Sequence, residues 1–391
     1  FPNEARLMSE GPFWRPETLK PTGDKILPLE SLRGLAALSV VVYHAGGQST
    51  FLDNAFFRHA YVMVDFFFVL SGYVIALNYF DRVRDLNSLA NFQKKRFWRL
   101  YPLHLATLVA FLAIEVAKYA FQQKTGITAN NPAFTVNDGG AFLANLALLQ
   151  GIVMPSPSFN IPSWSISAEF YTYLIFGLVL LVPARRLAIV LVAITGFAVF
   201  ALFQDGLIAD NYRFTLLRCV MSFFTGAGIH LVLRNRPMHF PAFAQPLALL
   251  TATLCVIALA HTSGEILLPV VFALVIVVFS SGQDQWTARA LSVRPLVWLG
   301  TISYSVYMTH SGVWWATEQF YRFVLELPTL TTDTGQVWLL YPPGTQLFYQ
   351  GIQLALTLLV SQITYSLIEV PFRYGLPRRK PANPGTAGGK A

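Results

Sequence analysis

Charged residues are scarce in this 391-residue chain, at 12% of its positions. A soluble domain carries about 25% charged residues, so the shortage excludes an ordinary soluble fold. Hydrophobic residues fill the gap, at 54%. Because a helix needs about 20 mostly apolar residues to cross a bilayer core roughly 30 Å thick, we expect an all-α, polytopic transmembrane helical bundle.

Cysteine is nearly absent as well. The two cysteines, Cys219 and Cys255, each lie inside an apolar run, which excludes a disulfide framework and a cysteine-rich metal site. The chain also lacks a phosphate-binding loop, a His-Glu-x-x-His zinc motif and a Gly-x-Ser-x-Gly nucleophile. We therefore expect no metal and no serine nucleophile.

Acidic residues are outnumbered, because 28 Lys and Arg face 20 Asp and Glu and give a formal net charge of +8. A membrane protein concentrates Lys and Arg in its cytoplasmic loops. The excess therefore indicates topology, and we expect no nucleic acid among the partners.

Ten apolar runs have the length of a membrane span. They cover residues 32–48, 57–79, 100–121, 163–183, 186–205, 214–233, 245–261, 266–281, 298–320 and 347–370. An eleventh run, 141–154, is short for a crossing. If it crossed, the arginine pairs within 185–186 and 234–236 would move outside and break the positive-inside pattern. We favour ten helices over eleven, with both termini cytoplasmic and Arg218 on the external side of the membrane.

The chain divides into three stretches. Residues 1–27 lack the apolar core of a cleaved signal peptide, so we expect a cytoplasmic N-terminal segment. Residues 28–373 form the predicted transmembrane domain. Residues 374–391 are rich in Pro, Gly, Lys and Arg, which predicts a disordered basic cytoplasmic tail.

Arg33 and His44 are ionisable residues of the first apolar run, and such residues at membrane depth are functional candidates. Eleven residues at 100° each place both side chains on one helix face, roughly 16 Å apart along the axis. A guanidinium suits the anchoring of phosphate or carboxylate, and an imidazole suits general-base work. The alternatives are that Arg33 marks a helix end and that His44 only bonds to a neighbouring helix.

Six motifs in a fixed order carry a family resemblance. They are Leu32-Arg33-Gly34 through Val42-Tyr43-His44 with Glu30 just before, Phe67 to Tyr73, Lys94 to Pro102, Trp164-Ser165-Ile166-Ser167-Ala168-Glu169, Gly300 to His310, and Tyr365 to Pro371. Together, over residues 27–373, they resemble the membrane-bound acyltransferase-3 family. One departure is that Lys94 and Lys95 begin the segment that is arginine-rich in the family, and lysine lacks the guanidinium fork.

The resemblance implies O-acyl transfer, usually of acetyl, from cytosolic acetyl-CoA or another acyl-CoA to hydroxyls of sugars, often in envelope modification at the inner (plasma) membrane. It also implies that Arg33 and His44 are essential. The predicted donor-binding residues are Lys95, Arg96, Arg99 and Arg33, because the CoA phosphates are too charged to enter lipid. A topology signal or lipid headgroup contact is the alternative for this basic cluster. Direct transfer and an acyl-histidine intermediate both stay open.

Further polar residues complete the candidate site. Glu169 is predicted as catalytic, through orienting His44 or binding acceptor hydroxyls, with pairing to a buried arginine as the alternative. Asp65 is predicted to pair with a cation or to stay protonated. Four more residues are predicted to bind substrate: Ser71, Trp164, Tyr304 and His310. Close helix packing of Ser71 and Gly72 is the favoured alternative for Ser71, and a position at the membrane interface is the alternative for Tyr304 and His310.

Other functions compete with this hypothesis. A secondary transporter can also carry buried Arg, His and acidic residues, but it would make no CoA-dependent product. A small glycosylated metabolite such as a macrolide is the alternative acceptor to a glycan. The expected partners are an acyl-CoA donor, a carbohydrate acceptor and membrane lipids, and the oligomeric state is open.

Overall fold

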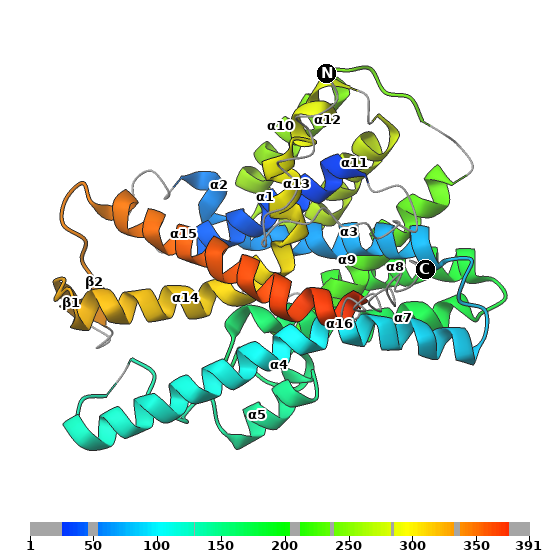
Figure 1. Ribbon diagram of the computed structural model, residues 1–391. Coiled ribbons are helices and arrows are strands. Elements are labelled where there is room, and N and C mark those ends of the chain that lie inside the picture. Colours follow the sequence, from blue (N-terminus) through cyan, green and yellow to red (C-terminus); the bar gives the residue numbers. More distant parts are fainter. Residues whose placement is uncertain are drawn as a thin grey trace, which may run out of the picture.

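The computed structural model describes residues 26–45, 54–128, 130–203, 212–234, 238–282, 285–331 and 337–374. Helices dominate these ranges, and one short hairpin joins them (Figure 1). The predicted segment 1–27 and the predicted tail 374–391 lie almost entirely outside the described residues.

The helices are as follows: α1 Leu27–Tyr43, α2 Ala55–Arg58, α3 Met63–Tyr79, α4 Leu86–Thr125, α5 Gly139–Leu146, α6 Gln150–Val153, α7 Trp164–Leu180, α8 Arg185–Phe203, α9 Thr215–Leu233, α10 Ala244–Leu259, α11 Leu268–Ser281, α12 Trp286–Leu291, α13 Arg294–Thr301, α14 Ser303–Phe323, α15 Gln346–Thr364 and α16 Val370–Tyr374. Short 3₁₀ turns are η1 Ala60–Val62, η2 Ile161–Ser163, η4 Tyr212–Phe214 and η5 Ser263–Leu267, and a π-helical turn, η6 Tyr365–Glu369, joins α15 to α16.

Six helices of the described ranges are long and apolar enough to cross a membrane: Ala60–Tyr79, Leu86–Thr125, Arg185–Leu202, Thr215–Leu233, Ser263–Ser281 and Gln346–Arg373. This is a multi-pass membrane protein. The other predicted spans coincide with α1, α7 and α10, which are shorter at 17, 17 and 16 residues, and with α14, which is more polar. The count of ten crossings stays a prediction.

The doubtful run at 141–154 is two helices and not one. The eight residues of α5 and the four of α6 are separated by Leu148, whose φ of 56° is left-handed and ends the first helix. Eight residues span about 12 Å at 1.5 Å each, well short of the roughly 30 Å bilayer core. Neither helix is long enough to cross alone.

Helix α4 begins earlier than the apolar pattern predicts. The third span was expected from residue 100, but one helix of 40 residues runs from Leu86 to Thr125 through Pro102. Asp85 starts it with a capping box, in which its carboxylate accepts from the Ser88 N–H and the Ser88 hydroxyl accepts from the Asp85 N–H. The basic segment from Lys94 to Pro102 therefore lies within helix α4 and not in a loop.

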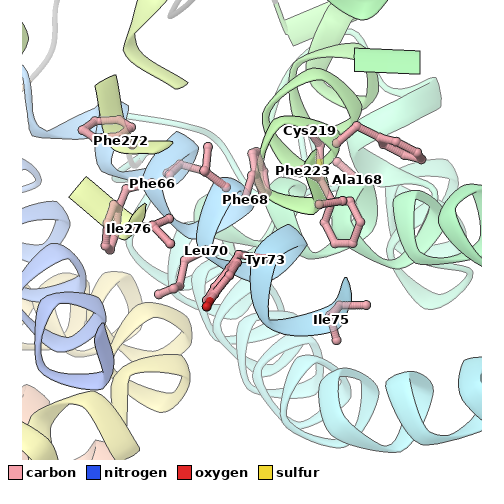
Figure 2. Close-up of a cluster of buried hydrophobic side chains, with 14 of the residues drawn as sticks. Phe66, Phe68, Leu70, Tyr73, Ile75, Ala168, Cys219, Phe223, Phe272 and Ile276 are labelled. Atoms are coloured by element: carbon pink, nitrogen blue, oxygen red, sulfur yellow. The ribbon is translucent and has the colours of Figure 1, made fainter. Parts of the chain in front are cut away.

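Helix α3 lies at the centre of the apolar core (Figure 2). Its buried residues are almost all apolar, as expected of a helix surrounded by protein, and α1, α9 and α11 pack against it. Its tightest neighbour is α9, because Gly72 touches the Phe223 backbone and Gly226 touches the Val69 backbone, with no room for a Cβ at either glycine. The packing role predicted for the small residues near Ser71 is thus confirmed for Gly72.

A two-stranded hairpin lies at the end of α14 and was not predicted. Strand β1, Thr329–Thr331, pairs antiparallel with β2, Val337–Leu339. The Asn130 side chain donates to the Val337 carbonyl at 3.0 Å and accepts from its N–H at 2.9 Å. These bonds join the loop that follows α4 to the hairpin, two segments about 200 residues apart in the sequence.

Candidate functional site

Arg33 is held by its own helix and by the start of α14. Its Nη1 and Nη2 donate to the Glu30 carboxylate at 3.2 and 2.7 Å. Nε donates to the Ser303 hydroxyl at 2.9 Å, and Nη2 also donates to the Gly300 carbonyl at 2.6 Å. A guanidinium has five N–H donors, so these bonds leave one. Arg33 fastens α1 to α13 and α14, and only this last N–H remains for its predicted role toward the donor.

Two glycines allow this close contact. A Cβ on Gly34 would collide with the Gly300 backbone, and a Cβ on Gly300 would collide with the Glu30 carbonyl. The backbones of α1 and α13 therefore touch beside Arg33. Both glycines belong to the motifs that carry the family resemblance, and the contact gives a physical reason for their presence.

His44 lies at the other end of α1 and contacts His310 of α14. Its Nδ1 lies 2.9 Å from the Val40 carbonyl oxygen and 3.3 Å from Nε2 of His310. The two ring centroids are 4.9 Å apart. His310 is fully buried, whereas His44 is exposed. Helical spacing thus puts Arg33 and His44 on the face that meets α13 and α14, and it brings His44 to a histidine that the sequence singled out only as a substrate-binding candidate.

The hydrogen bonds assign a tautomer to each neutral ring. Nδ1 of His310 lies 2.8 Å from the Tyr307 carbonyl oxygen, and because a carbonyl only accepts, this nitrogen carries the proton. Nε2 of His310 is then an acceptor facing His44. Nδ1 of His44 likewise carries a proton, since it meets the Val40 carbonyl. The lone pair of His44 is therefore on Nε2, the nitrogen for which no protein partner is found among the described residues.

The basic segment of α4 splits into two faces. Lys94 and Lys95 are exposed, whereas Arg96 and Arg99 are partly buried. Arg96 lies 5.2 Å from the ring centroid of Tyr79 and donates to its hydroxyl at 3.3 Å. Its Nε is buried without a partner in the described structure. The predicted donor-binding set therefore divides into a surface lysine, Lys95, and two arginines that face the bundle.

Glu169 lies in α7 and is bound by hydroxyl groups. The Ser71 hydroxyl donates to its carboxylate at 2.6 Å, and the Tyr173 hydroxyl donates to the same oxygen. Arg99 interacts electrostatically with Glu169, and pairing of Glu169 with a buried arginine stays a prediction. The proposed orienting of His44 by Glu169 is not seen, because His310 occupies that place.

A second carboxylate, Glu369, faces the same part of the bundle and was missed in the sequence. It is buried at 6% exposure, accepts from the Ser305 hydroxyl, and interacts electrostatically with Arg99 and Arg33. It lies inside the last apolar run, where an ionisable residue is a signal in itself. Arginines of α1 and α4 and carboxylates of α7 and η6 thus form one polar centre inside the bundle.

Trp164 and Tyr304, both predicted to bind substrate, have partners within the protein. Tyr304 donates to the Leu100 carbonyl at 2.6 Å and so joins α14 to α4. Trp164 lies at the start of α7, with its ring 5.7 Å from the Arg218 guanidinium and 6.2 Å from the Phe68 ring. The structure places neither residue against His44, and a substrate-binding role for them stays a prediction.

Asp65 forms a closed ion pair with Arg218. Nε and Nη2 of Arg218 donate to the two carboxylate oxygens at 2.9 and 2.7 Å, and the Ser222 hydroxyl adds a bond of 3.2 Å. Both residues of the pair are buried, at 2% and 6% exposure. Pairing of Asp65 with a cation was predicted and is confirmed, whereas the membrane side predicted for Arg218 stays a prediction.

Asp81 makes an ion-pair cluster in the turn between α3 and α4. It lies 2.8 Å from Arg234 and 3.5 Å from Arg185, and its side chain is 48% exposed. Partial burial acts to raise the pKa of Asp81, but the bond and charge of Arg234, with help from Arg185 and Arg84, outweigh it and lower the pKa below its usual range.

The class of protein follows from comparison with known families. A family model described as acyltransferase domain, of the acyltransferase-3 type, matches residues 27–365. The chain belongs to this family, and the resemblance drawn from the six motifs is confirmed.

Individual relatives are more distant. The chain is 36% identical to acyltransferase MdmB of Streptomyces mycarofaciens over 181 residues, which cover 42% of this chain and 43% of the relative. It is 23% identical to the peptidoglycan O-acetyltransferase OatA of Listeria monocytogenes and 26% identical to the putative peptidoglycan O-acetyltransferase YrhL of Bacillus subtilis, each over 375 residues. These two matches cover 88% of this chain, and 55% and 54% of the relatives. The chain spans about half the length of the curated relatives it matches. No solved structure matches it.

Proposed function

We propose that this protein is a membrane-bound O-acyltransferase that moves an acetyl group from cytosolic acetyl-CoA to a hydroxyl of an envelope or exported glycan. The observation that carries the proposal is the His44 imidazole. It is exposed, its Nδ1–H is held by the Val40 carbonyl and His310, and its Nε2 lone pair is free. Relatives named as peptidoglycan O-acetyltransferases support both the reaction and the glycan acceptor.

The chemistry requires one base near the acceptor. Nε2 of His44 takes the proton of the acceptor hydroxyl while the oxygen attacks the thioester carbonyl, and a new C–O bond forms. The C–S bond then breaks, and the departing CoA thiolate takes the proton back from the imidazolium. The products are an acyl ester and CoA thiol, so atoms and charge balance. A fixed tautomer contributes here because the base needs no rearrangement before it acts.

The donor is expected from the cytoplasmic side, at the inner membrane. Lys94 and Lys95 are exposed on α4 and offer charge to the CoA phosphates, while Arg96 has an unpaired buried Nε. The polar centre around Arg99 continues inward from this segment. Arg33 and His44, eleven residues apart on α1, span roughly 16 Å, a suitable reach for an extended pantetheine arm. If the donor binds from the cytoplasmic side, the Arg33 end of α1 lies at that side, and we expect both chain termini there as well.

The test is transfer of radiolabelled acetyl from acetyl-CoA into glycan by proteoliposomes holding the wild-type chain, His44→Ala or His239→Ala. His239 is an exposed histidine outside the site and serves as the matched control. We expect label with wild type and control and none with His44→Ala. Equal label in all three would overturn the role of His44, and no label in any would favour a transporter. Label in a small soluble metabolite would change the acceptor class and keep the reaction.

A further inference from the structure

We propose that the seam between α14 and α15, beside the end of α1, binds the hydroxyl groups of a carbohydrate acceptor. Three buried polar atoms would hold them: the Nε1–H of Trp314 and the Oε1 atoms of Gln350 and Gln353. The inference rests on the proposed function, because it names the acceptor subsite of the same reaction.

Trp314 lies one helical turn beyond His310 on α14. Positions i and i+4 share a helix face, so the indole follows the imidazole that contacts His44. Trp314 belongs to the apolar cluster that contains Val41, and Ala45 packs against this cluster. The indole therefore lies where α1 ends, close to the proposed base.

The two glutamines reach the same place from α15. Nε2 of Gln350 donates to the carbonyl of Ala45, the residue after His44, at 3.3 Å. Nε2 of Gln353 donates to the Thr317 hydroxyl at 3.0 Å, and that hydroxyl donates to the Trp314 carbonyl at 2.9 Å. Each amide is thus oriented by a bond to α1 or α14.

The remaining atoms of these side chains have no partner in the described structure. Nε1 of Trp314 and Oε1 of Gln350 and of Gln353 are buried and unpaired, in residues only 5%, 3% and 0% exposed. Leaving a buried polar group unpaired costs free energy. Three such groups around one seam indicate that something polar completes them.

A tryptophan and a glutamine with the same chemistry are paired elsewhere in the bundle, between α13 and α15. Nε1 of Trp298 donates to Oε1 of Gln362 at 2.7 Å, and Nε2 of Gln362 donates to the Ser366 hydroxyl at 2.9 Å. A tryptophan and a glutamine of this bundle therefore pair with each other where the protein requires only stability. At Trp314 and Gln353 the corresponding donor and acceptor stay apart.

A cavity of about 390 Å³ opens next to the seam. Thr317, the partner of Gln353, lines it together with Phe320, Tyr321 and Tyr349. Ligand pockets occupy roughly 300–1,000 Å³, so a sugar ring fits by size. The rest of its lining is apolar, Ala316, Leu325, Phe348, Ile352 and Leu356, and the three residues with unpaired atoms are not part of it. The cavity therefore suits the apolar faces of a sugar ring whose hydroxyl edges point toward the seam.

Carbohydrate is favoured over other occupants by the mixture of donor and acceptors. The indole N–H needs an oxygen, and the two amide oxygens need O–H or N–H groups. Neighbouring sugar hydroxyls supply both, whereas a lipid chain supplies neither. Ordered water would supply both as well, and it is the rival that the experiment must exclude.

The test measures equilibrium binding of a radiolabelled β-linked N-acetylhexosamine oligomer to purified protein in the His44→Ala background, so that no turnover takes place. We expect Gln350→Leu, Gln353→Leu and Trp314→Phe each to weaken binding by about two- to tenfold, the range of one hydrogen bond. Gln362→Leu and Trp298→Phe are the matched controls, and they should lower the unfolding temperature and leave binding unchanged.

Binding that ignores all three substitutions, together with an unchanged or raised unfolding temperature, would overturn the subsite and leave water as the partner. A second measurement separates this failure from failure of the proposed function. In the active protein we expect the acceptor KM to rise and the donor KM to hold. If binding depends on the three residues but no acyl transfer occurs in wild type, the subsite stands and the proposed reaction falls.

Discussion

Two pairs of ionisable side chains connect helices in this protein, and they differ in the bonds they leave unused. Arg218 meets both oxygens of Asp65, and Ser222 adds a third bond. His44 and His310 share one contact of 3.3 Å, and a nitrogen of His44 stays free. Both pairs join helices across the bundle, so pairing by itself does not mark the proposed reactive site. A nitrogen without a partner on an exposed side chain does.

The largest effect on activity is expected for the His44–His310 pair, in which one nitrogen of His44 has no partner among the described residues. His44→Ala should lower acyl transfer by about 10²–10⁴-fold, the usual contribution of a general base. The unfolding temperature in detergent should stay close to wild type, because the imidazole is exposed and makes few contacts. Turnover and thermal unfolding of the same preparation measure both. A variant that unfolds earlier and keeps its turnover per folded molecule would reverse the assignment.

The Asp65–Arg218 pair should respond in the opposite manner, with the main effect on stability. Arg218→Leu leaves the Asp65 carboxylate buried without a partner, which should destabilise the protein by about 3–5 kcal/mol. Replacing both residues, Asp65→Leu with Arg218→Leu, should restore much of the loss, since no unpaired charge remains. Unfolding temperatures in detergent give the answer. Equal instability of single and double variants would show that the pair does more than compensate its own burial.

A smaller effect is expected from the partner of the base. His310→Ala should lower kcat by about ten- to hundredfold, the range seen when a group that orients a functional histidine is removed. His310→Gln should recover part of the loss, because an amide oxygen can accept the His44 Nδ1–H. Turnover at saturating donor and acceptor checks this. Identical behaviour of the Ala and Gln variants would contradict a positioning role.

The smallest effect is expected at Asp81, whose ion pairs with Arg234 and Arg185 are partly exposed to solvent. Its folded-state pKa is lowered from the ordinary 3.8, so its stabilisation is complete above pH 3.8 and is lost as pH falls through the lower folded value. The difference in unfolding temperature between wild type and Asp81→Asn should be constant at neutral pH and shrink only below about pH 4. A difference that already shrinks at pH 6 would assign the effect to another group.

Local sequence patterns predicted which residues of α1 face the neighbouring helices, but not the residues that they contact. The eleven-residue spacing placed Arg33 and His44 on the face that meets α13 and α14. The ion pair of Glu30 with Arg33 was not predicted, although i, i+3 is a common helical arrangement for such a pair. The contact between His44 and His310 joins residues 266 positions apart, and no helical period reaches that far.

The ends of the helices were harder to predict from the sequence than the residues that share a helix face. The apolar pattern gave α4 a start at residue 100, because hydropathy reports lipid contact and not helix formation. The capping box at Asp85 and Ser88 starts the helix fourteen residues earlier. The sequence also did not show which residue pairs with Asp65, because Arg218 lies 153 positions away.

The contact between Gly34 of α1 and Gly300 of α13 is the point about which a tilt of α1 would turn. Backbones touch at Gly34 and Gly300, and Arg33 fastens them there, while the reactive nitrogen of His44 lies roughly 16 Å along the same helix. A tilt of about 4° at this pivot would swing His44 by about 1 Å, and a displacement of that size can cost about a hundredfold in rate. Lateral pressure or bilayer thickness, by tilting one helix, would then act directly on catalysis.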